Sequence, residues 1–353
     1  MKSTHLWIAS LWLFVVAMSS SPDAFAAKID VSGPITQDVQ WLGDTFAVVG
    51  DITINDTCTL TIAPGVVVLF MGPYAIHVQG RLMALGAPGD SIVFTAHDTT
   101  GFASNTHTGW RGIRFDHTPA TNDSSIFAYC VVEYAKGNDE GGGIYIHTFD
   151  SVSITHSIVR HCISVTNGGG VFLRDADVSI VRNTFSGNRT GVNGGALYIR
   201  GSNLVFDNNI LHHNAATRGG GINFIFNPVA TISNNVFHHN AASSQGGGIY
   251  FDFGSAIKLN NNSFFSNHAN GSGGAVTMSS NSDAEFTNCI LYGNTASSGK
   301  SVRLNDEASD PSFTYSTIEG NLAGFDLSGT TYTGTFTNNI DKDPRFANPG
   351  AGD

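Results

Sequence analysis

The chain of 353 residues contains little charge, proline or cysteine. Only 13% of its residues are charged, and 17 Lys and Arg are outnumbered by 28 Asp and Glu. Phosphate binding needs clustered basic residues, and none occur, so the charge pattern excludes a nucleic-acid partner and disfavours an anionic membrane surface. The 10 prolines, with glycines in pairs and triplets, exclude a collagen-like chain. A hydrophobic share of 41% excludes global disorder.

Long hydrophobic runs are also missing, because no stretch reaches the roughly 18 apolar residues of a membrane helix. The longest run, from Leu6 to Met18, follows Lys2 and precedes the small-x-small sequence Ala24-Phe25-Ala26. This arrangement predicts a signal peptide over residues 1–26, no transmembrane segment in the mature chain, and export to the exterior or the bacterial cell surface (outer membrane).

Glycine is abundant, with 41 residues, and much of it lies in a repeat. Six glycine clusters are each followed by an alternating apolar triplet such as Ile144-Tyr145-Ile146 or Leu197-Tyr198-Ile199. The clusters begin at Gly141, Gly168, Gly194, Gly219, Gly246 and Gly273. A repeat of this kind is the strongest fold signal that a sequence can carry.

Two polar columns share the same period of 26 or 27 residues. The first consists of Cys130, Ser157, Asn183, Asn209, Asn235, Asn262, Cys289 and Ser316. The second consists of Ala135, Cys162, Asn188, Asn214, Asn240, Asn267, Asn294 and Asn321. A spacing of two between apolar residues is a strand period, and the repeat is too short for a pair of helices.

These patterns predict an all-β chain that forms a single parallel β-helix with rungs of 26–27 residues. Successive rungs stack about 4.8 Å apart, so each residue meets its counterpart in the next rung. Asparagine tolerates left-handed backbone at bends, and its amide both donates and accepts, so the columns predict asparagine ladders along the axis. Leucine-rich repeats have a similar period, but their leucine spacing is missing here.

The alternation of GGA[ILV], as in Gly194-Gly195-Ala196-Leu197, with FxxN, as in Phe185 to Asn188 and Phe237 to Asn240, resembles the repeats of chlamydial-type polymorphic membrane proteins. More broadly, it is similar to right-handed β-helix proteins of the pectate-lyase superfamily. The resemblance covers roughly residues 128–322. It implies a right-handed helix, surface display and adhesin-like roles, and it carries over no catalytic residue.

The expected organisation is one continuous solenoid after the signal peptide. Residues 27–127 are expected to form the N-terminal cap and the first rungs, and residues 128–322 the regular rungs. Residues 323–353 form a C-terminal tail whose last part, from Asp341, resembles a motif that usually continues further, which indicates a truncated end. No segment rich in proline or serine separates these parts.

The four cysteines are not expected to form disulfides. Cys130 and Cys289 share a column but lie six rungs apart, about 29 Å at the strand spacing, whereas disulfide partners need Cα atoms within about 7 Å. Cys162 belongs to the other column and Cys58 to the N-terminal part. We interpret cysteine in the columns as a small buried substitute for asparagine or serine.

A stripe of outward-facing side chains is the candidate ligand-binding site. The aromatic residue between the paired apolar residues gives a row of rings, and the position two residues further on supplies a histidine and two arginines. The candidates are Tyr145, Phe172, Tyr198, Tyr250, His147, Arg174 and Arg200. Aromatic faces beside hydrogen-bonding groups suit pyranose rings, and paired arginines suit carboxylates or sulfates. The alternative is structural packing of rings across neighbouring strands.

A second cluster, His212-His213 and His238-His239, falls in adjacent rungs and offers four imidazoles for zinc or copper. No Asp, Glu or Cys completes the set at neighbouring positions, and adjacent histidines of a strand point to opposite sides unless the strand bends. We therefore interpret them as surface histidines, and we predict no metal site and no cofactor.

Two function classes remain. The first is a secreted or surface-exposed scaffold that binds an extracellular polysaccharide or cell-surface glycan without chemistry, in the manner of an adhesin. The second is a polysaccharide lyase or glycoside hydrolase. The acidic calcium cluster of pectate lyases and the paired Asp with Gly-His-Gly of polygalacturonases are absent. A calcium-independent elimination by Tyr198, His147 and Arg174 stays open, and we assign no catalytic residue. The sequence carries no signal for an oligomeric state.

Overall fold

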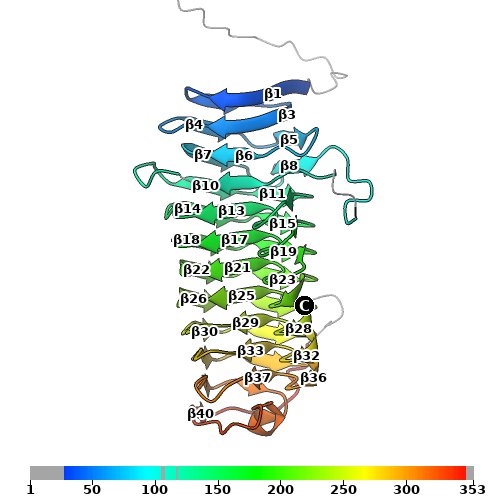
Figure 1. Cartoon of the computed structure of the whole chain (residues 1–353), viewed down its shortest axis with the longest axis vertical. Coiled ribbons are helices and arrows are strands. Elements are labelled where there is room, and N and C mark those ends of the chain that lie inside the picture. The colour runs from blue at the N-terminus through cyan, green and yellow to red at the C-terminus, as the bar shows by residue number, and fades with distance from the viewer. Residues whose placement is uncertain (1–27, 105–107, 117, 347–353) are drawn as a thin grey trace, which may run out of the picture.

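The protein is described by a computed structural model that covers residues 28–104, 108–116 and 118–346. The predicted signal peptide and the last seven residues of the tail lie outside this described part. Its strands pair in parallel and stack along one long axis, from β1 (Lys28–Ile35) at one end to β40 (Phe336–Thr337) at the other (Figure 1). The all-β parallel solenoid predicted from the repeat is confirmed.

Each regular rung contains four short strands, and equivalent strands of successive rungs form four stacks. Stack I follows the glycine clusters and contains β6 (Ile76–Val78), β9 (Ile113–Phe115), β13 (Ile144–His147), β17 (Val171–Arg174), β21 (Leu197–Arg200), β25 (Ile222–Ile225), β29 (Ile249–Phe251), β33 (Val276–Met278) and β37 (Val302–Leu304). Stack II contains β2 (Val39–Trp41), β4 (Thr59–Ile62), β7 (Arg81–Leu85), β10 (Ser125–Ala128), β14 (Val152–Thr155), β18 (Val178–Val181), β22 (Asn203–Asp207), β26 (Val229–Ser233), β30 (Lys258–Asn260), β34 (Glu285–Thr287), β38 (Ser312–Thr314) and β40.

The other two stacks complete the rung. Stack III contains β5 (Val67–Phe70), β8 (Ile92–Ala96), β11 (Cys130–Glu133), β15 (Ile158–Arg160), β19 (Thr184–Ser186), β23 (Ile210–His212), β27 (Val236–His238), β31 (Ser263–Phe265), β35 (Ile290–Tyr292) and β39 (Thr317–Ile318). Stack IV contains β12 (Lys136–Gly137), β16 (Ile163–Ser164), β20 (Arg189–Thr190), β24 (Ala215–Arg218), β28 (Ala241–Gln245), β32 (His268–Ser272) and β36 (Thr295–Ser298).

Two features mark the ends of the solenoid. The long strand β3 (Thr45–Ile54) pairs with β1 and also with β5 and β6, so it joins stacks I and III into one sheet of 21 strands. Near the other end, Asn321–Gly324 forms a single 3-10 turn. Among the described residues, no helix is long and apolar enough to cross a membrane.

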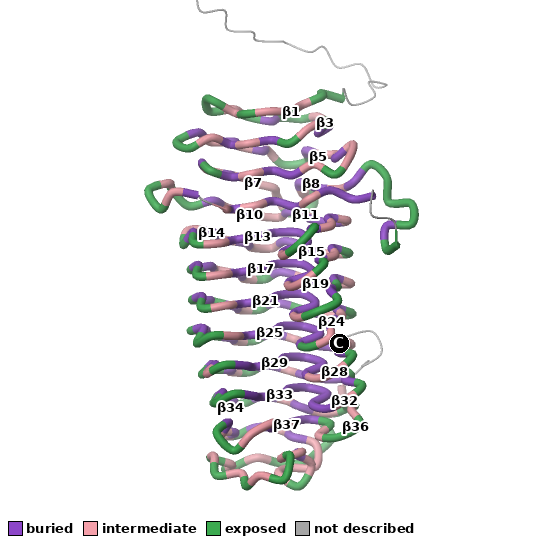
Figure 2. The backbone as a smooth tube through the Cα atoms, in the orientation of Figure 1, coloured by how far each residue is buried: buried purple, intermediate pink, exposed green. Residues whose placement is uncertain are grey.

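The interior is apolar and continuous along the axis, as the alternation predicted. The inward residues Ile144 and Ile146 are fully buried, and so are Leu197 and Ile199 two rungs on. Phenylalanines stack between rungs in the interior, with ring centroids 5.6 Å apart for Phe224 and Phe251. Buried residues follow the strands of each rung, and exposed residues lie mainly at the bends (Figure 2). Burial of apolar surface is therefore the main stabilising contribution.

Both asparagine ladders are present and buried. In the second column, the Oδ1 atom of Asn214 accepts the backbone N–H of Asn188 at 3.0 Å and its Nδ2 group at 3.1 Å. Asn214 in turn donates from Nδ2 to Asn240 Oδ1 at 2.9 Å and to Phe185 O at 2.9 Å. Each polar atom of the Asn214 side-chain amide thus has a hydrogen-bond partner, which offsets the cost of burying this amide.

The bends differ from the prediction in one respect. The left-handed residue is the one before the ladder asparagine, such as His213 before Asn214 (φ 55°) or Asn234 before Asn235 (φ 59°). This offset turns the asparagine side chain into the interior while its neighbour points outward. Asparagine in the columns is thus explained by its amide hydrogen bonds, and the left-handed backbone is carried by a histidine, asparagine, arginine, serine or glycine beside it.

The cysteines of the columns occupy ladder positions. The backbone N–H of Cys130 donates to Ser157 Oγ at 2.9 Å, as ladder asparagines do to the next rung. Its Sγ lies 3.6 Å from Ala84 O. Cys162 donates its backbone N–H to Asn188 Oδ1 at 3.0 Å. All four cysteines are buried, and each has a free thiol, which agrees with their interpretation as small buried substitutes.

Candidate functional site

The aromatic stripe lies on the outer side of stack I, in register from rung to rung. Tyr145 pairs with Phe172, and Phe172 with Tyr198. Their rings are stacked nearly parallel, with centroids 5.1 and 5.3 Å apart. Asn223 takes the next position and Tyr250 the one after it. The sequence alternation therefore brings the four predicted rings into one row, interrupted by an asparagine.

The row is outward but not open. The exposed fractions of Tyr145, Phe172, Tyr198 and Tyr250 are 8, 1, 6 and 4%. The first glycine of each cluster takes a positive φ and lies directly against the outward residue of the strand that follows, as Gly141 does against Tyr145 and Gly168 against Phe172. The chain thus doubles back over the outer side of stack I, and a side chain on these glycines would meet backbone.

The residues before the glycine clusters complete this cover. Asn193 donates from Nδ2 to Asn167 Oδ1 at 3.1 Å, and Asn167 donates to Glu140 Oε1 at 3.3 Å, so they form a short ladder over the rings. The guanidinium of Arg218 lies 5.5 Å from the Tyr250 ring centroid. Tyr145, Phe172 and Tyr198 form a second small hydrophobic cluster. These contacts favour the structural interpretation of the rings, and ligand binding by them stays a prediction.

The polar flank of the stripe is half-exposed and already engaged. His147 Nδ1 lies 3.5 Å from Asp116 Oδ1. Arg174 Nε donates to Asp175 Oδ2 at 3.4 Å. The Arg200 guanidinium lies 4.8 Å from the centroid of Phe226. The two arginines therefore do not converge on one point, although both remain near the surface.

A base made from the stripe tyrosines is disfavoured. Burial raises the pKa of Tyr198, and the nearby Arg200 lowers it by less. Burial also raises the pKa of Tyr145 and Tyr250. A catalytic base works best when its pKa lies near the operating pH, and these phenols are moved away from it. No contact in this region favours the elimination by Tyr198, His147 and Arg174.

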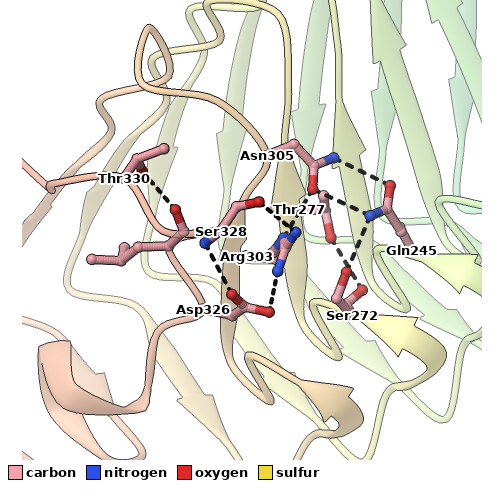
Figure 3. Close-up of polar contacts among 9 residues, drawn as sticks. Gln245, Ser272, Thr277, Arg303, Asn305, Asp326, Ser328 and Thr330 are labelled. Carbon is pink, nitrogen blue, oxygen red and sulfur yellow. Dashed lines mark hydrogen bonds and ion pairs between the residues drawn. The ribbon is translucent and has the colours of Figure 1, made fainter.

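Towards the C-terminal end, the covered row turns polar. Asn305 Nδ2 donates to Gln245 Oε1 at 3.2 Å, and Gln245 Nε2 donates to Ser272 Oγ at 3.1 Å (Figure 3). Arg303 donates from Nε to Asn305 Oδ1 at 2.9 Å and forms an ion pair with Asp326. The network joins the cover, stack I and the tail, and its donors and acceptors satisfy one another. We interpret it as structural.

The four histidines lie together on the outer side of stack III, at its bend towards stack IV. His213 and His239 have positive φ, so the strand bends and adjacent histidines point to the same side. His212 stacks on His238 with ring centroids 5.0 Å apart, and His213 on His239 at 5.1 Å. The exception for a bent strand therefore applies, and the adjacent histidines do not diverge. His238 is only 5% exposed, so its interpretation as a surface histidine is wrong.

These histidines are arranged for proton sharing, not for chelation. The Nδ1 atoms of His212 and His213 are 2.8 Å apart, and those of His238 and His239 are 2.9 Å apart. The ring centroids of the pairs are 5.1 and 5.2 Å apart. With the Nδ1 atoms this close, the ring centroids can hardly lie further apart, so the two rings extend in opposite directions from the Nδ1–Nδ1 contact. In each pair, the lone pair of one Nδ1 atom therefore points along the N–H of the other. In the described part of the chain, no group of three or more His, Cys, Asp or Glu is placed to hold a metal ion.

An open groove of about 520 Å³ crosses several rungs on the outer side of stack II, and the sequence reasoning missed it. Its floor is the outward row Ser153, Ser179, Val205 and Thr231, which are in register. Along its edge, the backbone N–H of Asp177 donates to Asp150 Oδ1 at 3.0 Å. The signal was the period-two pattern of β14 to β26, whose outward positions on the groove floor carry two serines, a valine and a threonine.

Two exposed rings stand at the bend between stacks I and II, and the sequence reasoning missed them too. Phe226 and Phe253 are stacked with centroids 4.9 Å apart, and they are 42 and 48% exposed. Phe226 also carries the Arg200 guanidinium over its face. An exposed aromatic pair with a cation beside it has the properties that the sequence analysis sought in the covered row.

Comparison with known families agrees with the architecture. Residues 169–341 match the family model for a right handed beta helix region. The fold is a right-handed parallel β-helix. No curated protein matches the chain. The matched region starts within the rungs that carry the GGA[ILV] and FxxN motifs, while the closer resemblance to polymorphic membrane proteins or to pectate lyases stays a prediction.

Proposed function

We propose that the protein is a secreted or surface-exposed β-helix that binds an extracellular glycan along the groove on stack II. The export part rests on the predicted signal peptide over residues 1–26. The binding part rests on one observation, which is an open groove that crosses successive rungs and presents hydroxyl groups and carboxylates at repeated positions.

The repetition suits an extended polymer. Rungs stack about 4.8 Å apart, so a chain lying along the solenoid axis meets one row of groups at each step. Ser153, Ser179 and Thr231 offer hydroxyl groups that donate and accept, and Asp150 and Asp177 accept hydrogen bonds from sugar hydroxyls. Val205 and Val229 are 51 and 66% exposed and give the apolar patches on which the C–H faces of pyranose rings rest.

The exposed pair Phe226 and Phe253 adds a platform at the neighbouring bend. Ring stacking against a sugar needs an accessible aromatic face, which the covered stripe of Tyr145, Phe172, Tyr198 and Tyr250 lacks and this pair has. We therefore assign the binding surface to the groove and this ring pair, with Arg200 beside it. Neutral polysaccharides and uronate polymers both fit this set of groups.

A panel of neutral and uronate-containing polysaccharides, tested by affinity electrophoresis and calorimetry, checks the proposal. Ser179→Trp places a bulky ring on the groove floor and is expected to weaken binding more than tenfold. Thr184→Trp is the matched control, because Thr184 is an outward residue of β19 in the same rung but on stack III. Phe226→Asn with Phe253→Asn removes the ring pair and keeps residues that tolerate positive φ.

The same panel separates binding from the lyase alternative. A lyase converts uronate polymers into unsaturated products that absorb in the ultraviolet, whereas a binding protein leaves the absorbance unchanged. If the parent chain forms such products and Ser179→Trp does not, the protein is an enzyme that acts at this groove and not a scaffold that only binds. No binding to any polysaccharide, or equal binding by Ser179→Trp and Thr184→Trp, would contradict the assignment.

A further inference from the structure

The outward row of stack I continues beyond Tyr145 towards the N-terminal end. Arg114 is in register with Tyr145, and His77 with Arg114. At these rungs the outer side of the stack opens into a pocket of about 340 Å³ whose walls also include Arg111 and Asn138. The charged end of the row is thus accessible, although its aromatic part is covered.

Arg111 is the group in this pocket that lacks a counter-ion. Its Nη1 atom donates to Lys136 O at 3.0 Å, and no Asp or Glu of the described residues forms an ion pair with it. Burial lowers the pKa of Arg111, which reflects the loss of water around a charged group. A guanidinium has five N–H groups in a planar fork, so most of its donors remain to be used.

Arg114 plays a different part, because it is already held in place. Its Nη1 atom donates to Glu140 O at 3.3 Å, and its Nη2 atom lies 3.4 Å from Asp139 Oδ1. Its guanidinium also lies 4.3 Å from the Tyr145 ring centroid. It therefore forms a positively charged wall of the pocket, and Arg111 is the group that is open to a ligand.

The acidic residues of the pocket restrict the kind of anion. Asp51 Oδ1 accepts the backbone N–H of Ala75 at 2.9 Å, and Asp139 is paired with Arg114. These carboxylates repel a compact polyanion, but they accept hydrogen bonds from hydroxyl groups, and the Asn138 amide both donates and accepts. A ligand that fits has one carboxylate for the Arg111 fork and several hydroxyl groups around it.

We propose that this pocket binds a sugar acid, with its carboxylate paired in bidentate fashion to the guanidinium of Arg111. Arginine forks match the planar geometry of carboxylates, and such charge-assisted pairs are the strong ones. The ligand is a free uronic acid or the end residue of a uronate polymer. This pocket lies on stack I and the groove on stack II, so the proposal does not depend on glycan binding at the groove.

Calorimetric titration of the full mature chain with D-glucuronate tests the proposal, with D-glucose, the methyl ester of glucuronate and inorganic sulfate as comparison ligands. Glucuronate is expected to bind, and the neutral sugar, the ester and sulfate to bind at least tenfold more weakly. Arg111→Met should weaken glucuronate binding at least tenfold. Arg182→Met is the matched control, because it removes the same charge at an exposed bend between stacks II and III, and it should leave binding unchanged.

Two further arms keep the test decisive. If Arg111→Met does not fold by circular dichroism, Arg111→Lys keeps the charge without the fork and should still weaken glucuronate binding several-fold. A uronate trimer that binds more tightly than glucuronate assigns the ligand to a polymer end, and equal affinity assigns it to the free acid. Sulfate or glucose binding as tightly as glucuronate would overturn the proposal, and so would equal glucuronate affinity of the Arg111 variants and the parent chain.

Discussion

Asn214 and Asn223 are both buried asparagines of neighbouring rungs, but only the first is fully hydrogen-bonded. Asn214 takes part in the second ladder with Asn188 and Asn240. Asn223 is 2% exposed in the covered row, its Nδ2 donates weakly to Tyr250 O at 3.4 Å, and its Oδ1 has no partner. Asn223 therefore faces outward from β25 without being exposed to solvent, because the glycine turns cover it.

This contrast predicts opposite results for the same substitution. Asn214→Leu leaves the donors of Asn188 and the carbonyl of Phe185 without a partner, so it should lower the free energy of unfolding by roughly 2–4 kcal/mol. Asn223→Leu removes an unsatisfied oxygen from between Tyr198 and Tyr250, so it should be neutral or stabilising by up to about 1 kcal/mol. Denaturant unfolding of both variants provides the measurement, and a loss of similar size at both positions would contradict the assignment.

The buried thiols give a second prediction at this scale. Burial raises the pKa of Cys130 and of Cys162 to about 12, and that of Cys289 to about 11. Since the thiolate is the reactive form, these thiols should not react with a disulfide reagent in the folded protein at pH 8. Four thiols should become reactive in denaturant without a reducing agent. Fewer than two in denaturant would mean that a disulfide holds the fold.

At the scale of elements, the glycine turns decide how stack I is covered. A Cβ on Gly195 would collide with the carbonyl oxygen of Gly220 in the next rung and would lie 2.6 Å from the backbone nitrogen of Ala215. A Cβ on Gly191, four residues earlier, would meet nothing closer than 4.0 Å. Close backbone packing therefore requires glycine at position 195, whereas it does not require glycine at position 191.

Gly195→Ala should be strongly destabilising, because two backbone segments must move apart to admit one methyl group. Gly191→Ala has no such conflict and should be neutral or stabilising by about 0.4–1 kcal/mol, since alanine restricts the unfolded chain. Thermal unfolding of the two variants compares them directly. A similar melting temperature for both would mean that the turns tolerate displacement and that the cover over Tyr198 is loose.

The histidine pairs on stack III predict a dependence of stability on pH. Burial, with smaller contributions from His212 and the other imidazoles, lowers the pKa of His238 to about 4. An unfolded histidine titrates near 6.5. Between these values the unfolded chain binds more protons than the folded chain, so stability falls as the pH is lowered from about 6.5 to about 4.

His238→Phe tests this contribution, because Phe265 already continues the same ring column in the next rung. The drop in melting temperature between pH 7.5 and pH 4.5 should be smaller in this variant than in the parent chain. Carboxylates titrate in both proteins, so the difference between the two drops in melting temperature reports the contribution of the His238 imidazole. His268→Asn, at an exposed position in β32, should keep the full drop. An unchanged drop in His238→Phe would contradict the prediction.

Particular elements show how far the sequence alone could predict the structure. The inward residues of stack I and both asparagine columns follow from a period of two within strands and of 26–27 between rungs. The cover over Tyr145 and Tyr198 does not follow, because Glu140, Asn167 and Asn193 lie in polar, glycine-rich segments without apolar periodicity. The groove and the Arg111 pocket depend on where neighbouring rungs leave space, which no single rung encodes.

At the scale of the whole molecule, the strands of each rung pair only with strands of the rungs before and after it. The backbone N–H of Ala215 donates to Asn188 O, and that of Ala241 donates to Asn214 O. Stability of such a solenoid is approximately a sum of rung terms and nearest-neighbour terms, so a local loss should stay local. The two ends, β1 and β40, each have a neighbour on one side only among the described strands.

Hydrogen exchange of the parent chain and of Asn214→Leu measures how far such a loss spreads. Exchange should become faster in residues 183–245, which include the ladder partners Asn188 and Asn240, because their amides lose protection when the middle rung opens. Residues 28–85, several rungs away along the axis (Figure 1), should keep their rates. If instead all rungs lost protection equally, opening would be global, and the continuous apolar interior, not the contact between adjacent rungs, would set the cooperative unit.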